Sequence, residues 1–227
     1  MIVLAALIGL FTGTLVNWAS DWLPRFAGRG DAPMPRYRVY TLYPKLYENR
    51  LSIAVELSTA LVFALLWATR GAASAFEGAA YCALYALLLL IAITDLKHRL
   101  IANVVTYPLL AIMIVPQLIT GISAGGDVRP LLLGGALTFG MFSLIAWIKP
   151  GSLGGGDVKL ATLIGVMFGF PQVLWALIIG VGSGGLMAAL LLATGRGGRS
   201  TRIPYAPFLC LGAMLALLYN PVNWYLR

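Results

Sequence analysis

Two aspartates occupy places in this chain where carboxyl groups can do chemistry. Asp95 closes one long apolar stretch, and Asp157 opens another directly after three glycines. Two carboxyl groups held close together cannot both ionise readily, so they share one proton. One can then deprotonate a water molecule while the other protonates the carbonyl group of a peptide bond. The pair therefore favours peptide hydrolysis, and either aspartate can begin as the base because coupled groups titrate together.

A structural interpretation of the same residues stays open at this stage. Asp157 can be an ordinary helix-capping aspartate that follows a flexible turn. Asp95 can simply end a membrane span beside Lys97 and Arg99. Whether the two carboxyl groups lie at the same depth therefore depends on how the helices that carry them cross the membrane.

The composition places these aspartates in a membrane protein. Of the 227 residues, 60% are hydrophobic and only 11% are charged, which is more apolar than a soluble domain of this length. A helix needs about 20 mostly apolar residues to cross a bilayer. Eight stretches meet or approach this requirement: 2–20, 52–69, 78–95, 101–120, 130–148, 157–170, 172–194 and 204–220. We predict an all-α fold, a polytopic membrane helical bundle of about eight transmembrane helices.

The predicted bundle forms one integral-membrane domain over residues 1–227, with a short cytoplasmic loop at 21–50. With the N-terminus outside, thirteen of the sixteen Lys and Arg residues fall in inward connections, as expected when cytoplasmic loops carry the basic excess. Insertion and contact with anionic lipids explain the net charge of +8, so we predict membrane lipids and no nucleic acid as partners. In this orientation Asp95 and Asp157 both lie at the cytoplasmic edge. Between them in the sequence, one helix crosses the membrane outward and a second one returns.

The glycines before Asp157 suit a peptide-binding turn. Glycine permits a positive φ and lets an extended substrate approach without meeting a Cβ atom. Such a turn also places Asp157 near the free N–H groups of a helix start. We therefore expect Gly154 and Gly156 to shape the site around the carboxylate.

The run Gly154-Gly155-Gly156-Asp157-Val158-Lys159 resembles the GxGD-x-K signature of type IV prepilin peptidases, a branch of the GxGD aspartyl proteases. Similar segments cover residues 9–17, 56–63, 95–106 and 203–208. The resemblance implies a multi-pass enzyme of the bacterial inner membrane, acting in type IV pilus or type II secretion systems. It would cleave the leader peptides of prepilin or pseudopilin substrates at the cytoplasmic face, with Asp95 and Asp157 as catalytic residues.

The resemblance implies no metal and no cofactor for proteolysis. Many members of the family also methylate the new N-terminus with S-adenosylmethionine, but no nucleotide-binding motif supports that activity in this sequence. Many members carry paired CxxC motifs in the first cytoplasmic loop, which would bind zinc through four thiolates. Residues 21–50 contain no cysteine, so such a zinc site is excluded there. Ala102 stands where the family often has proline.

Further polar residues are candidates for substrate binding or for supporting the carboxylates: Gly154, Gly156, Lys159, Glu56 and Asn103. Glu56 lies inside the second apolar stretch, where a carboxylate needs a partner such as Lys159 or Lys97. His98 is the sole histidine and lies three residues after Asp95. A lone histidine at a membrane edge faces water or lipid headgroups more often than it takes part in catalysis.

Two other functions remain as alternatives. A proton-coupled transporter of small solutes would also use membrane carboxylates, although its acids are expected nearer the midplane, within broken helices. An inactive scaffold of a pilus or secretion machine would fit the missing cysteines. The retained pair of aspartates at one membrane edge favours the peptidase.

Overall fold

The structure, a computed structural model, describes residues 1–26, 50–71, 74–124, 127–150, 153–195 and 204–219. Within these ranges the chain is helical and has no strand, which confirms the predicted all-α fold. The elements are α1 (Ile2–Phe26), α2 (Arg50–Leu66), the π-helical turn η1 (Trp67–Gly71), α3 (Ala75–His98), α4 (Asn103–Ala124), α5 (Arg129–Ile148), α6 (Gly155–Phe168), α7 (Val173–Ala193) and α8 (Ala206–Tyr219).

Each of the eight predicted stretches overlaps one of these α-helices over most of its length. Among the described residues, five helices are long and apolar enough to cross a membrane, namely α1, α2 with η1, α3, α5 and α7. The helices α6 and α8 have only 14 residues each, fewer than a full span requires. Large apolar side chains such as Phe11, Leu61 and Ile178 are exposed on the long helices, as expected of surfaces that face lipid.

The helix α1 extends further than the sequence predicted. It runs to Phe26, beyond the end of the predicted apolar stretch 2–20. Asp21 is therefore helical, and residues 21–26 of the predicted loop belong to α1. The rest of the predicted loop, residues 27–49, lies outside the described residues.

The first of two compact units, Met1–His98, is built on close packing of α1 against α2. A Cβ atom at Gly9 would lie 2.7 Å from the Cα of Ala60, and one at Gly13 would lie 2.7 Å from the Cα of Glu56. Small residues four apart let two helix backbones approach this closely in a membrane. The helix α3 packs against α1 in the same unit.

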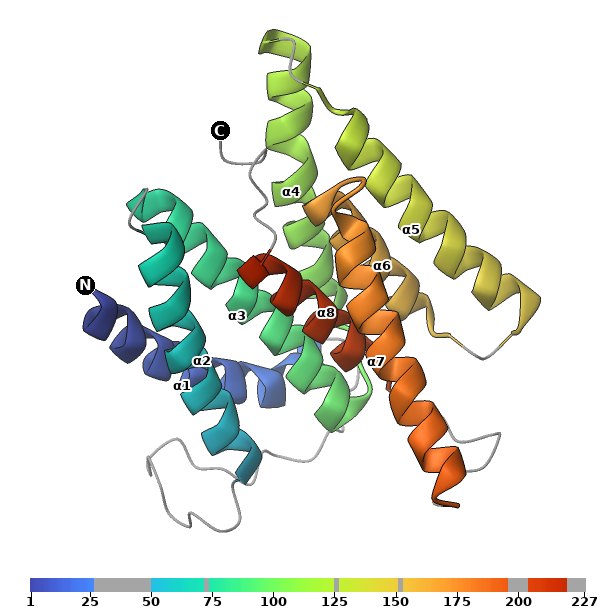
Figure 1. Ribbon diagram of the computed structural model, residues 1–227, viewed down its shortest axis with the longest axis horizontal. Coiled ribbons are helices and arrows are strands. Elements are labelled where there is room, and N and C mark those ends of the chain that lie inside the picture. The colour runs from blue at the N-terminus through green and yellow to red at the C-terminus, as the bar shows by residue number, and fades with distance from the viewer. Residues whose placement is uncertain (27–49, 72–73, 125–126, 151–152, 196–203, 220–227) are drawn as a thin grey trace. The chain divides into compact units, whose positions relative to one another are not determined.

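The second unit, Arg99–Arg227, surrounds the short helix α6. Four helices contact it, namely α4, α5, α7 and α8 (Figure 1). Every residue from Leu160 to Gly169 is buried except Thr162, which is half-buried. Because its neighbours cover it, α6 does not need the length of a helix exposed to lipid.

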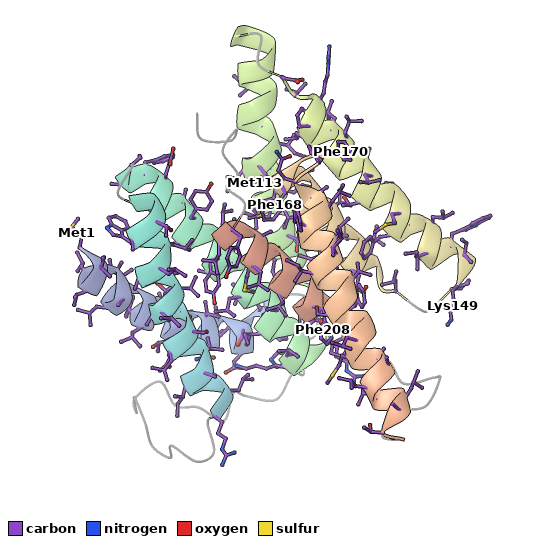
Figure 2. All side chains as sticks on the ribbon, in the orientation of Figure 1. Met1, Met113, Lys149, Phe168, Phe170 and Phe208 are labelled. Carbon is purple, nitrogen blue, oxygen red and sulfur yellow. The ribbon has the colours of Figure 1, made fainter. Side chains whose placement is uncertain are left out.

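The helices α5 and α6 run antiparallel and touch through glycine. The N–H group of Phe170, after α6, donates a hydrogen bond of 2.8 Å to the carbonyl oxygen of Pro130, at the start of α5. Figure 2 shows Phe170 beside this end of α5 and Lys149 at its far end. The start of α6, which carries Asp157, therefore lies toward the Lys149 end of α5.

The pair α7 and α8 also packs through small residues. A Cβ atom at Gly180 would lie 3.1 Å from the Cα of Leu209, and one at Gly184 would lie 3.1 Å from Cε2 of Tyr205. Gly180 and Gly184 lie four residues apart, so both face α8 and let the two helices approach closely.

We predict that Gly165→Ala destabilises the protein, because the added methyl group would overlap the hydroxyl of Thr138 and the carbonyl oxygen of Gly134. Overpacking of this kind costs about 1 to 3 kcal/mol. The control is Gly140→Ala on α5, where no described atom lies within 4 Å of the new methyl group. Thermal unfolding in detergent should show a lower midpoint for the first variant only, and equal midpoints would contradict the tight α5–α6 contact.

Candidate active site

Asp157 is fixed by the first turn of α6. It is the third residue of the helix, and its Oδ2 accepts a hydrogen bond of 3.0 Å from the backbone N–H of Gly154. The N–H of Asp157 donates to the carbonyl oxygen of Gly154, also at 3.0 Å. The bond from Gly154 and the positive end of the helix dipole favour a negative charge on the carboxylate, whereas burial of the side chain opposes that charge.

The glycines before Asp157 act differently from the sequence prediction. Gly154 has a φ of −78° and a ψ of 152°, and Gly155 and Gly156 are helical. Among the described residues the glycines with positive φ are Gly169 and Gly195, so Gly154, Gly155 and Gly156 do not use the positive φ that glycine permits. The physical reason is that α6 begins earlier than expected and takes two of the glycines into its first turn.

Close approach explains one of these glycines. A Cβ atom at Gly156 would lie 3.0 Å from the Cβ of Ile101, which precedes α4. No described atom lies within 4 Å of a Cβ atom built at Gly155. Gly156 therefore brings the backbone of the Asp157 turn against the start of α4, while Gly155 leaves open space.

Lys159 and Asn103 meet at the same end of the second unit. The Nζ atom of Lys159 donates a hydrogen bond of 3.1 Å to Oδ1 of Asn103 and lies 4.8 Å from the ring centroid of Tyr107. This ammonium group therefore links α6 to α4 two residues beyond Asp157. Both residues were candidates from the sequence, and the structure brings them together.

Tyr205 is a residue near Asp157 that the sequence did not single out. The Asp157 carboxylate acts electrostatically on the phenol of Tyr205. The Tyr205 ring lies 6.3 Å from the ring of Phe142, between centroids, and touches α7 at Gly184. The only sequence signal was its place in the segment 203–208, at the start of the last helix.

Asp95 lies in the first unit, in the last turn of α3. Its residue surface is only 7% exposed, so the carboxylate is largely removed from solvent. Glu56 is half-buried on α2, where its Cα and Cγ face Gly13 of α1. Asp95 belongs to the first unit, and Asp157 belongs to the second.

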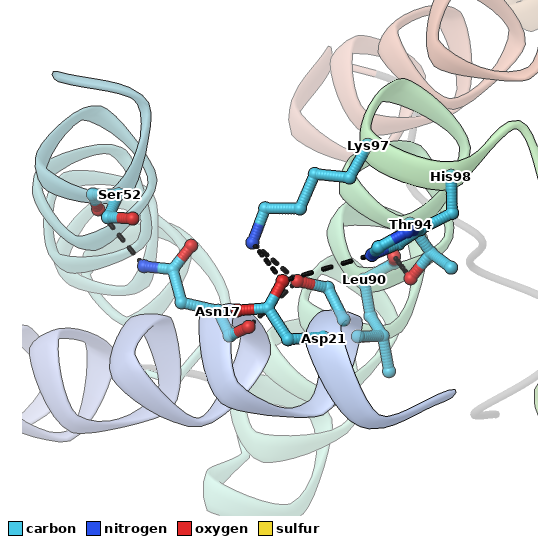
Figure 3. Close-up of polar contacts among 8 residues, drawn as sticks. Asn17, Asp21, Ser52, Leu90, Thr94, Lys97 and His98 are labelled. Carbon is cyan, nitrogen blue, oxygen red and sulfur yellow. Dashed lines mark hydrogen bonds and ion pairs between the residues drawn. The ribbon is translucent and has the colours of Figure 1, made fainter. Parts of the chain in front are cut away.

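A cluster of polar side chains joins the end of α1 to the end of α3 (Figure 3). The Nζ atom of Lys97 lies 2.8 Å from Oγ of Ser20 and 3.0 Å from Oδ1 of Asp21. The Nε2 atom of His98 lies 3.9 Å from the same Asp21 oxygen. Sequence reasoning missed this cluster because it placed Asp21 in a loop.

Comparison with known proteins decides the family. A model of the type IV leader peptidase family matches residues 82–193, a range that contains both Asp95 and Asp157. The prepilin leader peptidase/N-methyltransferase of Bacillus subtilis is 31% identical over 205 residues, which cover 88% of this chain and 75% of the relative. The chain belongs to the type IV leader peptidase family.

As a member of the type IV leader peptidase family, the chain is a protease of the membrane. A prepilin leader peptidase/N-methyltransferase of Legionella pneumophila is 28% identical over 151 residues, 63% of this chain and 52% of the relative. Its namesake in Xanthomonas campestris is 28% identical over 142 residues, 59% of this chain and 48% of the relative. No solved structure matches the chain.

We predict that Gly156→Ala lowers both peptidase activity and stability, because the new methyl group would push the Asp157 turn away from Ile101. A tenfold loss of rate is expected, since a shift of about 1 Å in a catalytic group costs up to about 100-fold. The adjacent Gly155→Ala is the matched control and should keep the parent rate. Rates and unfolding midpoints of purified variants test this, and an equal loss at both positions would contradict it.

Proposed function

We propose that this protein cleaves the leader peptides of type IV prepilin or pseudopilin precursors at the cytoplasmic face of the inner membrane, with Asp95 and Asp157 as the catalytic pair. The observation that carries the proposal is the family match, which includes both aspartates. The curated relatives carry the name prepilin leader peptidase, and the same class of substrate is proposed for this chain.

The proposed chemistry follows from two carboxyl groups that share one proton. The ionised carboxylate removes a proton from water, and the water oxygen attacks the carbonyl carbon of the scissile bond. The protonated carboxyl group donates to the carbonyl oxygen as the tetrahedral intermediate forms. A proton then passes to the departing amine, the C–N bond breaks, and the shared proton is restored. No metal or cofactor is needed for these steps.

The chain connectivity supports the proposed pairing of aspartates from different units. Asp95 precedes Ile101 by only six residues, and Ile101 packs against Gly156 beside Asp157. The hydrogen bond from Gly154 favours the ionised form of Asp157, whereas burial opposes it, so either aspartate can begin as the base.

The neighbouring residues have proposed supporting roles. Gly154 and Gly156 would leave room for an extended substrate beside Asp157, and Lys159 with Asn103 would hold the start of α4 against it. Glu56 would contact substrate or support the α1–α2 contact. Family membership favours the peptidase over a transporter, and the aspartate pair favours it over an inactive scaffold.

N-methylation of the mature N-terminus is a second candidate function, because the relatives are named as N-methyltransferases too. Two hollows in the second unit are lined by Pro171, Gln172, Leu174, Trp175 and Ile178, and by Trp175, Ile179, Leu215, Ala216 and Tyr219. Neither offers a carboxylate for the ribose hydroxyl groups of S-adenosylmethionine. These two described hollows therefore do not fit that cofactor.

Cleavage of a tagged prepilin in membranes tests the proposed peptidase. The parent should release the leader peptide, whereas Asp95→Asn and Asp157→Asn should each reduce the rate by at least about 1,000-fold, as expected when one member of a catalytic unit is removed. Cleavage that persists in a well-folded variant would contradict the pair. The mass of the product N-terminus, recorded with S-adenosylmethionine added, decides methylation through a gain of one methyl group.

Cysteine labelling at the two ends of α5 tests the proposed orientation. Cys82 and Cys210 are buried, so the parent should react little with a membrane-impermeant maleimide. Asp127→Cys should react in intact cells, while Lys149→Cys should react only after the inner membrane is opened, because basic connections stay in the cytoplasm. The reverse pattern would place the N-terminus in the cytoplasm and both aspartates at the outer face of the membrane.

A further inference from the structure

The proposed mechanism makes no use of the charged pair Asp21–Lys97 in the first unit. The two side chains are only 13% and 16% exposed, and their charged atoms lie 3.0 Å apart. Ser20, which accepts the second hydrogen bond from the Lys97 ammonium, is fully buried. Figure 3 shows Lys97 reaching from the last turn of α3 toward the end of α1. The pair is therefore a contact between helices and not a surface ion pair.

A pair this well shielded is a poor choice if stability is its only purpose. Removing two charges from water costs much of what their attraction returns, so apolar residues of similar size often serve equally well. The best-attested use of buried ion pairs is to fix the register of packed elements. An exposed pair in this chain provides the contrast: Asp127 and Arg129 are 64% and 87% exposed and lie 3.9 Å apart.

Helix geometry connects the pair to Asp95. Successive residues of an α-helix are rotated by about 100°, so Lys97 and Asp95 project about 200° apart around α3. When Asp21 and Ser20 hold Lys97 toward α1, the rotation of this turn is set and Asp95 points to the opposite side. The helix ends directly afterwards, because Arg99 has a φ of 51° and leaves the helical conformation.

The partner side of the pair is itself anchored. Asn17, one turn before Asp21 on α1, donates a hydrogen bond of 3.1 Å from Nδ2 to the backbone oxygen of Ser52 on α2. Gly13, a further turn back, packs on the backbone of α2. The end of α1 is therefore held by α2, and it can act as a fixed support for the last turn of α3.

We propose that Asp21 and Lys97, with Ser20, are positioning residues that set the rotation of the last turn of α3 and so orient the Asp95 carboxylate for proteolysis. This inference rests on the proposed function, in which Asp95 is a catalytic residue. The pair touches neither substrate nor the reacting atoms, and its effect on the reaction passes through the helix. It should therefore change the rate of the chemical step more than the binding of substrate.

The test compares Asp21→Asn, Lys97→Gln and the exchanged double variant Asp21→Lys with Lys97→Asp, using purified enzyme and a tagged prepilin. Each single variant should lower kcat by about 10-fold to 100-fold, as misorientation of a catalytic group does, with KM within about twofold of the parent. The double variant restores an ion pair and should recover at least about tenfold over either single variant. Asp127→Asn, which removes the exposed pair, is the control and should keep the parent kcat.

A merely structural pair would give a different result. It would lower the amount of folded protein or its unfolding midpoint, while kcat per mole of folded enzyme stayed at the parent value. Parent kcat in folded Asp21→Asn would overturn the proposal, and so would a double variant no faster than the single ones. If the single variants fail to fold, the folded double variant alone decides. A kcat near that of the parent supports the proposal. A kcat below about a tenth of the parent value, which is the loss expected for a misoriented catalytic group, overturns it.

Asp95→Asn and Asp157→Asn in the same assay separate the two hypotheses. If both abolish cleavage while the variants at Asp21 and Lys97 do not slow it, the catalytic pair stands and only the positioning role fails. If cleavage survives at Asp95→Asn, the proposed function itself fails, whatever the ion pair does.

Discussion

The cost of placing carboxylates at the edge of an apolar medium governs this structure. A charged group that leaves water must regain its lost solvation through hydrogen bonds or an opposite charge. Asp157 meets part of this condition with the backbone N–H group of Gly154 at the start of α6. Asp21 meets it with the ammonium group of Lys97. These two solutions differ in kind, because the first is local in sequence and the second joins two helices.

The local solution leaves Asp157 suited to chemistry. The hydrogen bond that Asp157 accepts comes from its own turn and not from a side chain on another helix. The surrounding residues then serve mainly to hold that turn in place. Gly156 brings it against Ile101, and Lys159 bonds to Asn103 across the α4–α6 contact.

Close helix contacts through glycine explain how a 14-residue helix can carry this turn. The helix α6 is enclosed by α4, α5, α7 and α8, so its ends need not reach both faces of a bilayer. Contacts at Gly134 and Gly165 bring the backbones of α5 and α6 together without a side chain between them. The same device joins α1 to α2 at Gly9 and Gly13. Small residues thus determine the packing in both units, while large apolar side chains face outward.

The sequence by itself determined which segments are helices and which acidic residues mark helix ends. A long apolar run in a bilayer can satisfy its backbone only as a helix, and each of the eight stretches overlaps one. The glycine triplet likewise predicted that Asp157 lies at a helix start, although not the φ angles of that turn. Only the tertiary structure decided that α1 continues past Asp21, because the compensating charge of Lys97 lies 76 positions away. It also decided the contacts of Gly156 with Ile101 and of Tyr205 with Gly184, since such pairs depend on how helices pack and leave no periodic pattern in the chain.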